Sequence, residues 1–225
     1  MARMYPHPMR PDTDSRAEVL LYDLFEKELP DTYHVFHSVA WQSRTAGHFR
    51  RDGEADFVIV HPDKGILVLE AKAGQIDYDG RTGKWTQNNH DMGKDPFEQA
   101  KGSLYHLRDT LNEEYYWRER DIAFGHAVAF TDVVAPTTPI SLQAPGSIIL
   151  DKRNLQDVEA WVANAFEYYR GGRKRNGIDA YGMGYIVDLL APVRELRSLI
   201  GIDIKDEQKE FIRLTEEQFS LLDFL

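Results

Sequence analysis

The sequence contains no cysteine. Disulfide bonds and thiolate metal sites are therefore excluded, and the composition suits a reducing compartment, so a cytoplasmic protein is predicted. Any bound metal must be held by oxygen or imidazole ligands, and hard oxygen ligands favour Mg²⁺ or Mn²⁺ over Zn²⁺. The eight histidines show no paired metal-ligand spacing.

Long apolar runs are also absent. No run approaches the roughly 18 residues that a membrane-spanning helix needs, so no membrane partner is expected. The N-terminal string MARMYPHPMRPDTDS has no apolar core and does not resemble a secretory signal. We expect residues 1–14 to form a flexible, loosely attached arm.

The sequence has no excess of positive charge: 27 Lys and Arg stand against 37 Asp and Glu, a net charge of −10. A protein that binds nucleic acid by phosphate neutralisation alone is usually basic, so a simple DNA-coating protein is disfavoured. An enzyme with a local basic groove is not excluded. Three basic clusters suit either such a groove or solvated loops: Arg44/Arg50/Arg51, Arg81/Lys84 and Arg173/Lys174/Arg175.

Apolar periodicity and turn residues predict alternating helices and strands. Helices are predicted at 15–29, 96–111 and 155–169, and strands at 33–41, 54–60, 66–72, 122–134 and 147–150. A small hairpin is predicted at 76–87, and residues 186–190 are predicted to start another helix or to form a short strand. Ser15 and Asp95 can cap the first two helices, and Glu18 completes a capping box with Ser15. This order predicts an α/β fold with a mixed central β-sheet flanked by helices.

The two strands at 54–60 and 66–72 form a predicted hairpin whose five-residue turn is centred on Asp63. Antiparallel partners then have numbers that sum to 126, so Asp56 faces Glu70 and Glu54 faces Lys72. Because side chains alternate, these four charged residues share the even-numbered face, whereas the odd-numbered face from Ala55 to Ala71 is apolar.

Directly opposed carboxylates disfavour a sheet, and partial burial adds to the cost. A divalent cation between Asp56 and Glu70, with Lys72 beside it, would relieve the repulsion. The alternative is a surface salt-bridge cluster in which Glu54 pairs with Lys72. The apolar flanking sequence is typical of a buried strand pair and favours the metal site.

These strings, GEADFVIV at 53–60 and GILVLEAK at 65–72, resemble the nuclease-related domain, NERD, which is placed in the PD-(D/E)XK nuclease superfamily. The resemblance spans roughly residues 15–111 within an expected domain at 15–200. It implies a nuclease-like fold. The literal dipeptide Pro62-Asp63 lies at the hairpin tip, seven residues from Glu70 or roughly 23 Å at about 3.3 Å per residue, too far to share a cation with it.

The resemblance implies that Asp56 and Glu70 bind Mg²⁺ or Mn²⁺ with the Ala71 carbonyl, and that Lys72 orients or activates the attacking water. It also implies catalytic roles for two helix residues. Glu18 is an outer ligand or orienting group, or only part of the capping box. Gln99 resembles a glutamine that some relatives use, or is an ordinary exposed residue. Glu54 is expected as a partner of Lys72 rather than a ligand.

The C-terminal segment 201–225 contains LTEEQFSLLDFL, which is similar to the adenine-reading motif that opens superfamily 1 helicase domains. An amphipathic helix with a Thr cap is the alternative. No phosphate-binding loop of the pattern GxxxxGK[ST] is present. We therefore expect no ATPase site here, and interpret the chain as the N-terminal domain of a longer nuclease-helicase.

The function predicted from these features is metal-dependent hydrolysis of DNA phosphodiester bonds, by a Mg²⁺- or Mn²⁺-dependent deoxyribonuclease. Two alternatives remain: a catalytically weak module that docks nucleic acid or a partner, and a regulatory module for an attached helicase. The opposed carboxylates argue against the first alternative, because a docking module has no need for them.

Overall fold

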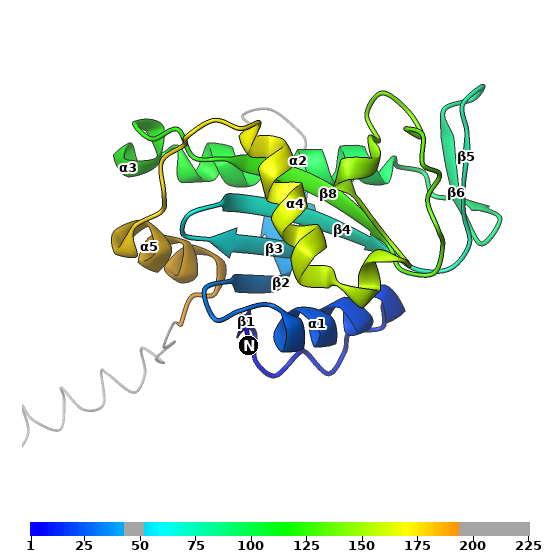
Figure 1. The fold of residues 1–225 in the computed structure, drawn as a ribbon. Helices are drawn as coiled ribbons and strands as arrows, with labels where there is room; N and C mark the ends of the chain where they lie inside the picture. The colour runs from blue at the N-terminus through cyan, green and yellow to red at the C-terminus, as the bar shows by residue number, and fades with distance from the viewer. Residues whose placement is uncertain (43–51, 194–225) are drawn as a thin grey trace, which may run out of the picture. The chain divides into compact units, whose positions relative to one another are not determined.

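The computed structural model describes residues 1–42 and 52–193, and Met1–Ala191 form one compact unit. The centre of this unit is a six-stranded mixed sheet in the order β1-β2-β3-β4-β8-β9 (Figure 1). Its strands are β1 (Arg3–Tyr5), β2 (His34–Gln42), β3 (Asp52–His61), β4 (Gly65–Lys72), β8 (Phe124–Phe130) and β9 (Ile149–Asp151). Strands β2, β3 and β4 are antiparallel neighbours, whereas the β1–β2, β4–β8 and β8–β9 pairs are parallel. The predicted mixed α/β architecture is confirmed.

A second, three-stranded sheet follows β4 in the chain. It comprises β5 (Ile76–Asp79), β6 (Lys84–Gln87) and β7 (His90–Asp91), all antiparallel. The hairpin predicted at 76–87 is confirmed, and β7 was not predicted. Trp85 of β6 is buried and packs near Phe97 and Phe130, so the small sheet contributes to the main core.

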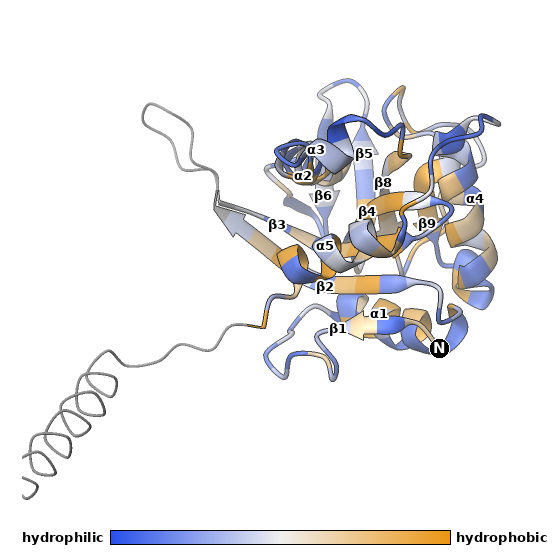
Figure 2. Ribbon diagram, turned by 90° about the vertical axis from the view of Figure 1, so that its left-hand side faces the viewer, coloured by the Kyte–Doolittle hydropathy of each residue, from blue (hydrophilic) through white to orange (hydrophobic). Residues whose placement is uncertain are grey.

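Helices cover both faces of the large sheet. They are α1 (Arg16–Glu28), α2 (Pro96–Leu111), α3 (Tyr115–Arg118), α4 (Val158–Arg170) and α5 (Ala180–Leu190), with 3₁₀ turns η1 (Gly146–Ile148) and η2 (Asn154–Gln156). In Figure 1, α4 crosses the near face of the sheet and α2 runs behind it. One core cluster joins α1 and α4 to the sheet, and the other includes the C-terminal half of α2, α3 and α5. Figure 2 shows hydrophobic colouring along β2, β3 and β4, between these helical layers.

The two predicted helix caps are confirmed. The Ser15 hydroxyl accepts a hydrogen bond from the Glu18 backbone N–H at 3.4 Å, and the Asp95 carboxylate accepts one from the Phe97 N–H at 2.7 Å. Each side chain satisfies a backbone donor that the first helical turn leaves free. The caps fix where α1 and α2 begin, and both helices carry residues that we expected at the site.

The predicted hairpin register is confirmed over most of its length. Val60 pairs with Ile66 and Val58 with Val68, and their numbers sum to 126. The ladder ends at the pair Phe57–Leu69. Beyond it, β3 stays paired with β2 and β4 stays paired with β8, so the two strands diverge. The charged residues therefore stand where the strands part, not opposite each other in a continuous ladder.

The predicted alternation fails at one place. Ser38 of β2 has φ +55°, a left-handed conformation that a non-glycine residue seldom adopts. On one side of Ser38, His37 contacts Tyr22 of α1 and Phe57 of β3. On the other side, Val39 and its strand partner Ala55 pack into the core on the opposite face of the sheet. Ala55 therefore lies on the opposite face of the sheet from Phe57, although alternation predicted both on one face. The change of face occurs in both paired strands, between His37 and Val39 in β2 and between Phe57 and Ala55 in β3.

Two strands were predicted too long. The predicted strand 122–134 is observed only as β8, and just beyond it the Asp132 carboxylate accepts a hydrogen bond from the Gly74 N–H at 2.7 Å. The predicted strand 147–150 begins as the 3₁₀ turn η1 and reaches the sheet only as β9. The predicted helix at 155–169 is α4, and residues 186–190 belong to α5.

The prediction of a loosely attached arm at residues 1–14 is wrong for its first part. Arg3–Tyr5 form β1, which pairs in parallel with β2, and the Arg3 N–H bonds to the Tyr33 carbonyl at 2.9 Å. Met4 within this strand and Ala2 just before it are buried. In the sequence, Ala2 and Met4 alternate with Met1, Arg3 and Tyr5, which is a strand pattern. Five residues are too few for this pattern to be distinguished from an unstructured tail.

Some predictions lie outside the described residues. These are the segment 201–225 and the basic cluster Arg44/Arg50/Arg51. Within residues 1–42 and 52–193, no helix has the length and apolar character needed to cross a bilayer.

Met4→Ala tests the contribution of β1 to the fold. We expect a loss of about 2 kcal/mol in the free energy of unfolding, because a buried thioether side chain is replaced by a cavity. Arg3→Ala is the matched control, since Arg3 lies in the same strand with an exposed side chain. Urea unfolding followed by circular dichroism measures both. Equal midpoints for the two variants would contradict a packed β1.

His61, at the end of β3, should make stability depend on pH. Its Nδ1 accepts a hydrogen bond from the Asp63 N–H at 3.1 Å, and burial lowers its pKa from 6.5 to about 4. Between about pH 4 and 6.5, His61 therefore stays neutral in the folded state and is protonated in the unfolded chain. The stabilisation is complete above pH 6.5 and falls as the pH drops towards 4.

His61→Asn isolates this effect, because the Asn oxygen keeps an acceptor for the Asp63 N–H and does not titrate. Between pH 7 and 5 we expect the wild type to lose about 1 kcal/mol more unfolding free energy than the variant, after allowance for partial solvent screening. Urea midpoints at both pH values give the difference. Parallel pH profiles would contradict the assignment.

Candidate functional site

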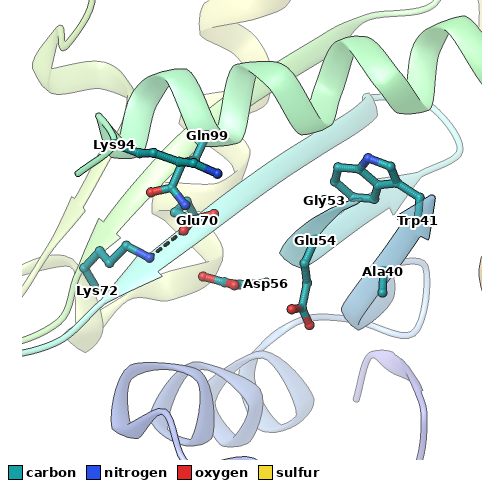
Figure 3. A pocket seen from close by; sticks show the side chains of 9 residues that line it. All are labelled: Ala40, Trp41, Gly53, Glu54, Asp56, Glu70, Lys72, Lys94 and Gln99. Carbon is teal, nitrogen blue, oxygen red and sulfur yellow. Dashed lines mark hydrogen bonds and ion pairs between the residues drawn. The ribbon is translucent and has the colours of Figure 1, made fainter. Parts of the chain in front are cut away.

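A cleft of about 700 Å³ opens where β3 and β4 diverge, beneath the N-terminal part of α2 (Figure 3). Its lining comes from the ends of β2, β3 and β4 and from the start of α2. The lining residues are Ala40, Trp41, Gly53, Glu54, Asp56, Glu70, Lys72, Lys94 and Gln99. Asp56, Glu70 and Lys72 thus share one cleft, as the sequence predicted.

Asp56 is fixed by the backbone of the neighbouring strand. Its Oδ2 accepts a hydrogen bond from the Ala71 N–H at 2.7 Å, just past the last paired residues of the hairpin. The side chain takes the place of the ladder bond that the diverging strand no longer provides. The second carboxylate oxygen remains directed towards the cleft, beside Glu70 and Lys72 (Figure 3).

Glu70 and Lys72 form an ion pair on β4. The Lys72 Nζ lies 2.5 Å from the Glu70 Oε1. The Lys72 side chain is 19% exposed and the Glu70 side chain is 4% exposed. Burial of a charged ammonium would lower the pKa of Lys72, but the charges of Glu70, Asp56 and Glu18 outweigh it, so the pKa is raised. Lys72 therefore stays protonated in the cleft.

Each of the two carboxylates is hard to ionise. Burial and then the charge of Glu70 raise the pKa of Asp56, despite the bond from Ala71. Burial also raises the pKa of Glu70, although the adjacent Lys72 ammonium opposes the shift. One ammonium does not offset two buried carboxylates, so a further cation near them would be favourable.

Glu18 reaches this region from the first turn of α1. The Glu18 Oε2 lies 2.8 Å from the Nε2 of His37. The Glu18 carboxylate is close enough for its charge to raise the pKa values of Asp56, Glu70 and Lys72. Burial would raise the pKa of Glu18, but hydrogen bonds from His37 and Ser15 outweigh it and lower the pKa. Glu18 is thus an ionised carboxylate beside the cleft.

The other predicted residues divide into two groups. Gln99 lines the cleft from α2, so it is placed with the acidic residues. Glu54 also lines the cleft, but its carboxylate accepts the Ser38 hydroxyl, and Lys72 pairs with Glu70. The expected partnership of Glu54 with Lys72 is therefore wrong. The cause is the divergence of β3 from β4, which separates positions that a continuous ladder would align.

Three residues of the site were not predicted from sequence. His37 is the partner of Glu18, Lys94 places an exposed side chain at the cleft, and Trp41 forms part of its wall. Trp41 lies over Gly53, where a Cβ would approach the indole to 2.6 Å, and its ring stacks on His106 with centroids 5.0 Å apart. Lys94 directly precedes the Asp95 cap, which is the only sequence signal that pointed towards it.

The donor set suits a hard divalent cation. Within the described part of the chain, no cluster of three or more His, Cys, Asp or Glu is arranged to hold an ion. Mg²⁺, however, is commonly held by one or two carboxylates and completed by water and substrate phosphates. Asp56 and Glu70 supply such a pair of carboxylates, and the Ala71 backbone lies beside Asp56.

Comparison with known proteins identifies the family. The family model named "NERD: Nuclease-related domain" matches residues 13–131, more than half of the chain. This span contains α1, β2, the β3–β4 hairpin, α2 and β8. It also contains every residue that lines the cleft, from Ala40 to Gln99. No curated protein and no solved structure matches the chain. The chain belongs to the nuclease-related domain family.

Proposed function

We propose that this domain hydrolyses phosphodiester bonds of DNA with the help of Mg²⁺ or Mn²⁺. The observation that carries the proposal is the meeting of Asp56, Glu70 and Lys72 in one cleft at the divergence of β3 and β4. Two buried carboxylates and an ammonium are the groups that a PD-(D/E)XK nuclease uses, and this resemblance is part of the proposal.

In this mechanism Asp56 and Glu70 would hold the cation, together with the Ala71 carbonyl. The cation supplies Lewis acidity towards the phosphate when it is bound. The Ala71 N–H keeps the Asp56 carboxylate in place, which preorganises the site before substrate arrives. Lys72 lies beside Glu70, and its ammonium would orient the attacking water and balance the negative charge that develops on the phosphate.

Gln99 and Lys94 have different tasks. The Gln99 amide faces the carboxylates from α2 and can donate a hydrogen bond to a phosphate oxygen or to water (Figure 3). Lys94 is exposed and forms no ion pair within the described residues, so its ammonium is free to meet the DNA backbone. Its contribution is to binding, since it lies outside the group of buried charges.

A second candidate is a module that docks nucleic acid without cutting it. Two observations favour it: the net charge of −10 weakens unaided DNA binding, and Lys72 neutralises Glu70 without a metal. A helicase attached through the segment 201–225 would deliver substrate to either kind of module. That link rests on the sequence of a segment outside the described residues.

Nicking of supercoiled plasmid with Mg²⁺ or Mn²⁺ tests the assigned roles. Asp56→Asn, Glu70→Gln and Lys72→Met preserve shape and remove charge, and we expect each to lower the cutting rate at least about 100-fold. Cutting by these variants at the wild-type rate would show that the site is misassigned.

Asp63→Asn is the matched control for this experiment. It alters the aspartate of the literal Pro62-Asp63 motif at the hairpin tip, far along β4 from Glu70, and should leave the rate unchanged. A wild type that binds DNA and does not cut it would favour the docking module.

Lys94→Ala tests the proposed DNA contact. Binding of a fluorescein-labelled oligonucleotide should weaken, and the slope of log affinity against log salt should fall by about 1, because one phosphate contact is lost. Lys84→Ala is the control, since the Lys84 ammonium is paired with Asp91 at 2.9 Å on the small sheet. An unchanged salt slope for Lys94→Ala would contradict the contact.

A further inference from the structure

His37 is a buried histidine whose side chain makes one polar contact among the described residues. Its side chain is 0% exposed, and its Nε2 lies 2.8 Å from the Glu18 Oε2. Its Nδ1 is buried and has no hydrogen-bond partner in the part of the chain that the structure describes. The proton of the neutral ring is therefore assigned to Nε2, where it is donated to Glu18, because a proton on Nδ1 would have no acceptor.

The surroundings hold the imidazole in one orientation. The ring of Tyr22 meets it edge-on at 5.7 Å between centroids, and the ring of Phe57 lies 5.0 Å away on the other strand. Both are buried hydrophobic neighbours. A ring packed in this way cannot swing to a second polar partner, so it presents its N–H to Glu18 alone.

The backbone around His37 is built for this contact. The left-handed Ser38 turns Val39 to the opposite core and leaves His37 beneath α1, where regular alternation would place both on one face. Glu18 lies in the first turn of α1, and the helix start is fixed by the Ser15 cap. Two independent backbone devices thus bring the imidazole and the carboxylate together.

A structural role alone explains this arrangement poorly. An apolar residue at position 37 would fill the core without an unpartnered nitrogen, and a partly exposed Glu18 could remain solvated. Glu18 does not line the cleft itself, but its carboxylate lies close enough for its charge to act on Asp56, Glu70 and Lys72. We infer that His37 is a positioning residue, which holds the Glu18 carboxylate beside the Asp56–Glu70 cleft, so that its negative charge stabilises a bound divalent cation from outside the set of direct ligands. This inference rests on the proposed function.

Two amide substitutions separate positioning from packing. In His37→Gln the side-chain nitrogen can reach about the position of Nε2, whereas in His37→Asn it reaches only about that of Nδ1 and stops short of Glu18. Both variants place one polar amide in the same core. With Mn²⁺ alone as the probe, we expect His37→Gln to bind like the wild type and His37→Asn to bind at least about tenfold more weakly.

A double substitution shows whether His37 acts through Glu18. In a Glu18→Ala background, His37→Asn should cause no further loss of Mn²⁺ affinity. Free Mn²⁺ measured by electron paramagnetic resonance gives the dissociation constants on the whole chain, and circular dichroism verifies that each variant is folded. This readout is independent of nuclease activity.

The outcomes separate the two hypotheses. Equal Mn²⁺ affinities for His37→Gln and His37→Asn, with a wild type that binds Mn²⁺ and cuts DNA, would overturn the positioning role and leave the nuclease proposal standing. A further loss in the Glu18→Ala background would overturn it too. A wild type that binds no Mn²⁺ would overturn the metal centre and the positioning role together.

Discussion

Two carboxylates that share a half-buried cleft repel each other, and this cleft accommodates them through groups placed on adjacent backbone. The Lys72 ammonium contacts Glu70, and the Ala71 N–H contacts Asp56. Since these partners lie on β4 itself, the strand that carries one acid also supplies the compensation for both. Burial still raises the pKa of Asp56 and of Glu70, so the balance is incomplete. A cation placed in the cleft would reduce the remaining electrostatic cost.

The cleft exists because two β-strands separate. A hairpin that continued past Phe57 and Leu69 would occupy its backbone groups in ladder bonds and would press Asp56 against Glu70. Because β3 and β4 diverge, the Ala71 N–H is free to bind the Asp56 side chain. In the same region, the left-handed Ser38 changes which face of the sheet the following residues of β2 occupy. The cleft is therefore made by an interruption of regular structure, while the rest of the hairpin remains an ordinary buried strand pair.

The sequence predicted what depends on local pattern. The hairpin register followed from alternation and a five-residue turn, and the starts of α1 and α2 followed from Ser15 and Asp95. These signals lie within a few residues of the features they determine. Asp56 and Glu70 could be grouped for the same reason, since one turn relates them.

What depends on contacts distant in sequence could not be predicted. The contact of Glu18 with His37 joins two elements 19 residues apart, and no periodicity reveals which strand residue lies beneath a helix. The left-handed Ser38 interrupts the alternation on which the prediction relied, so Ala55 was assigned to the wrong face. Lys94 approaches the cleft only because the small sheet and α2 are packed against the main core.

Strand β1 has a consequence for how the protein behaves when its N-terminus is damaged. Its three residues cover the outer edge of β2 over His34–Phe36, immediately before His37. Proteolytic clipping of this short segment would expose backbone donors and acceptors along a mostly apolar strand. Exposed edges of that kind pair readily with another copy of the same chain, so clipped molecules would be prone to self-association.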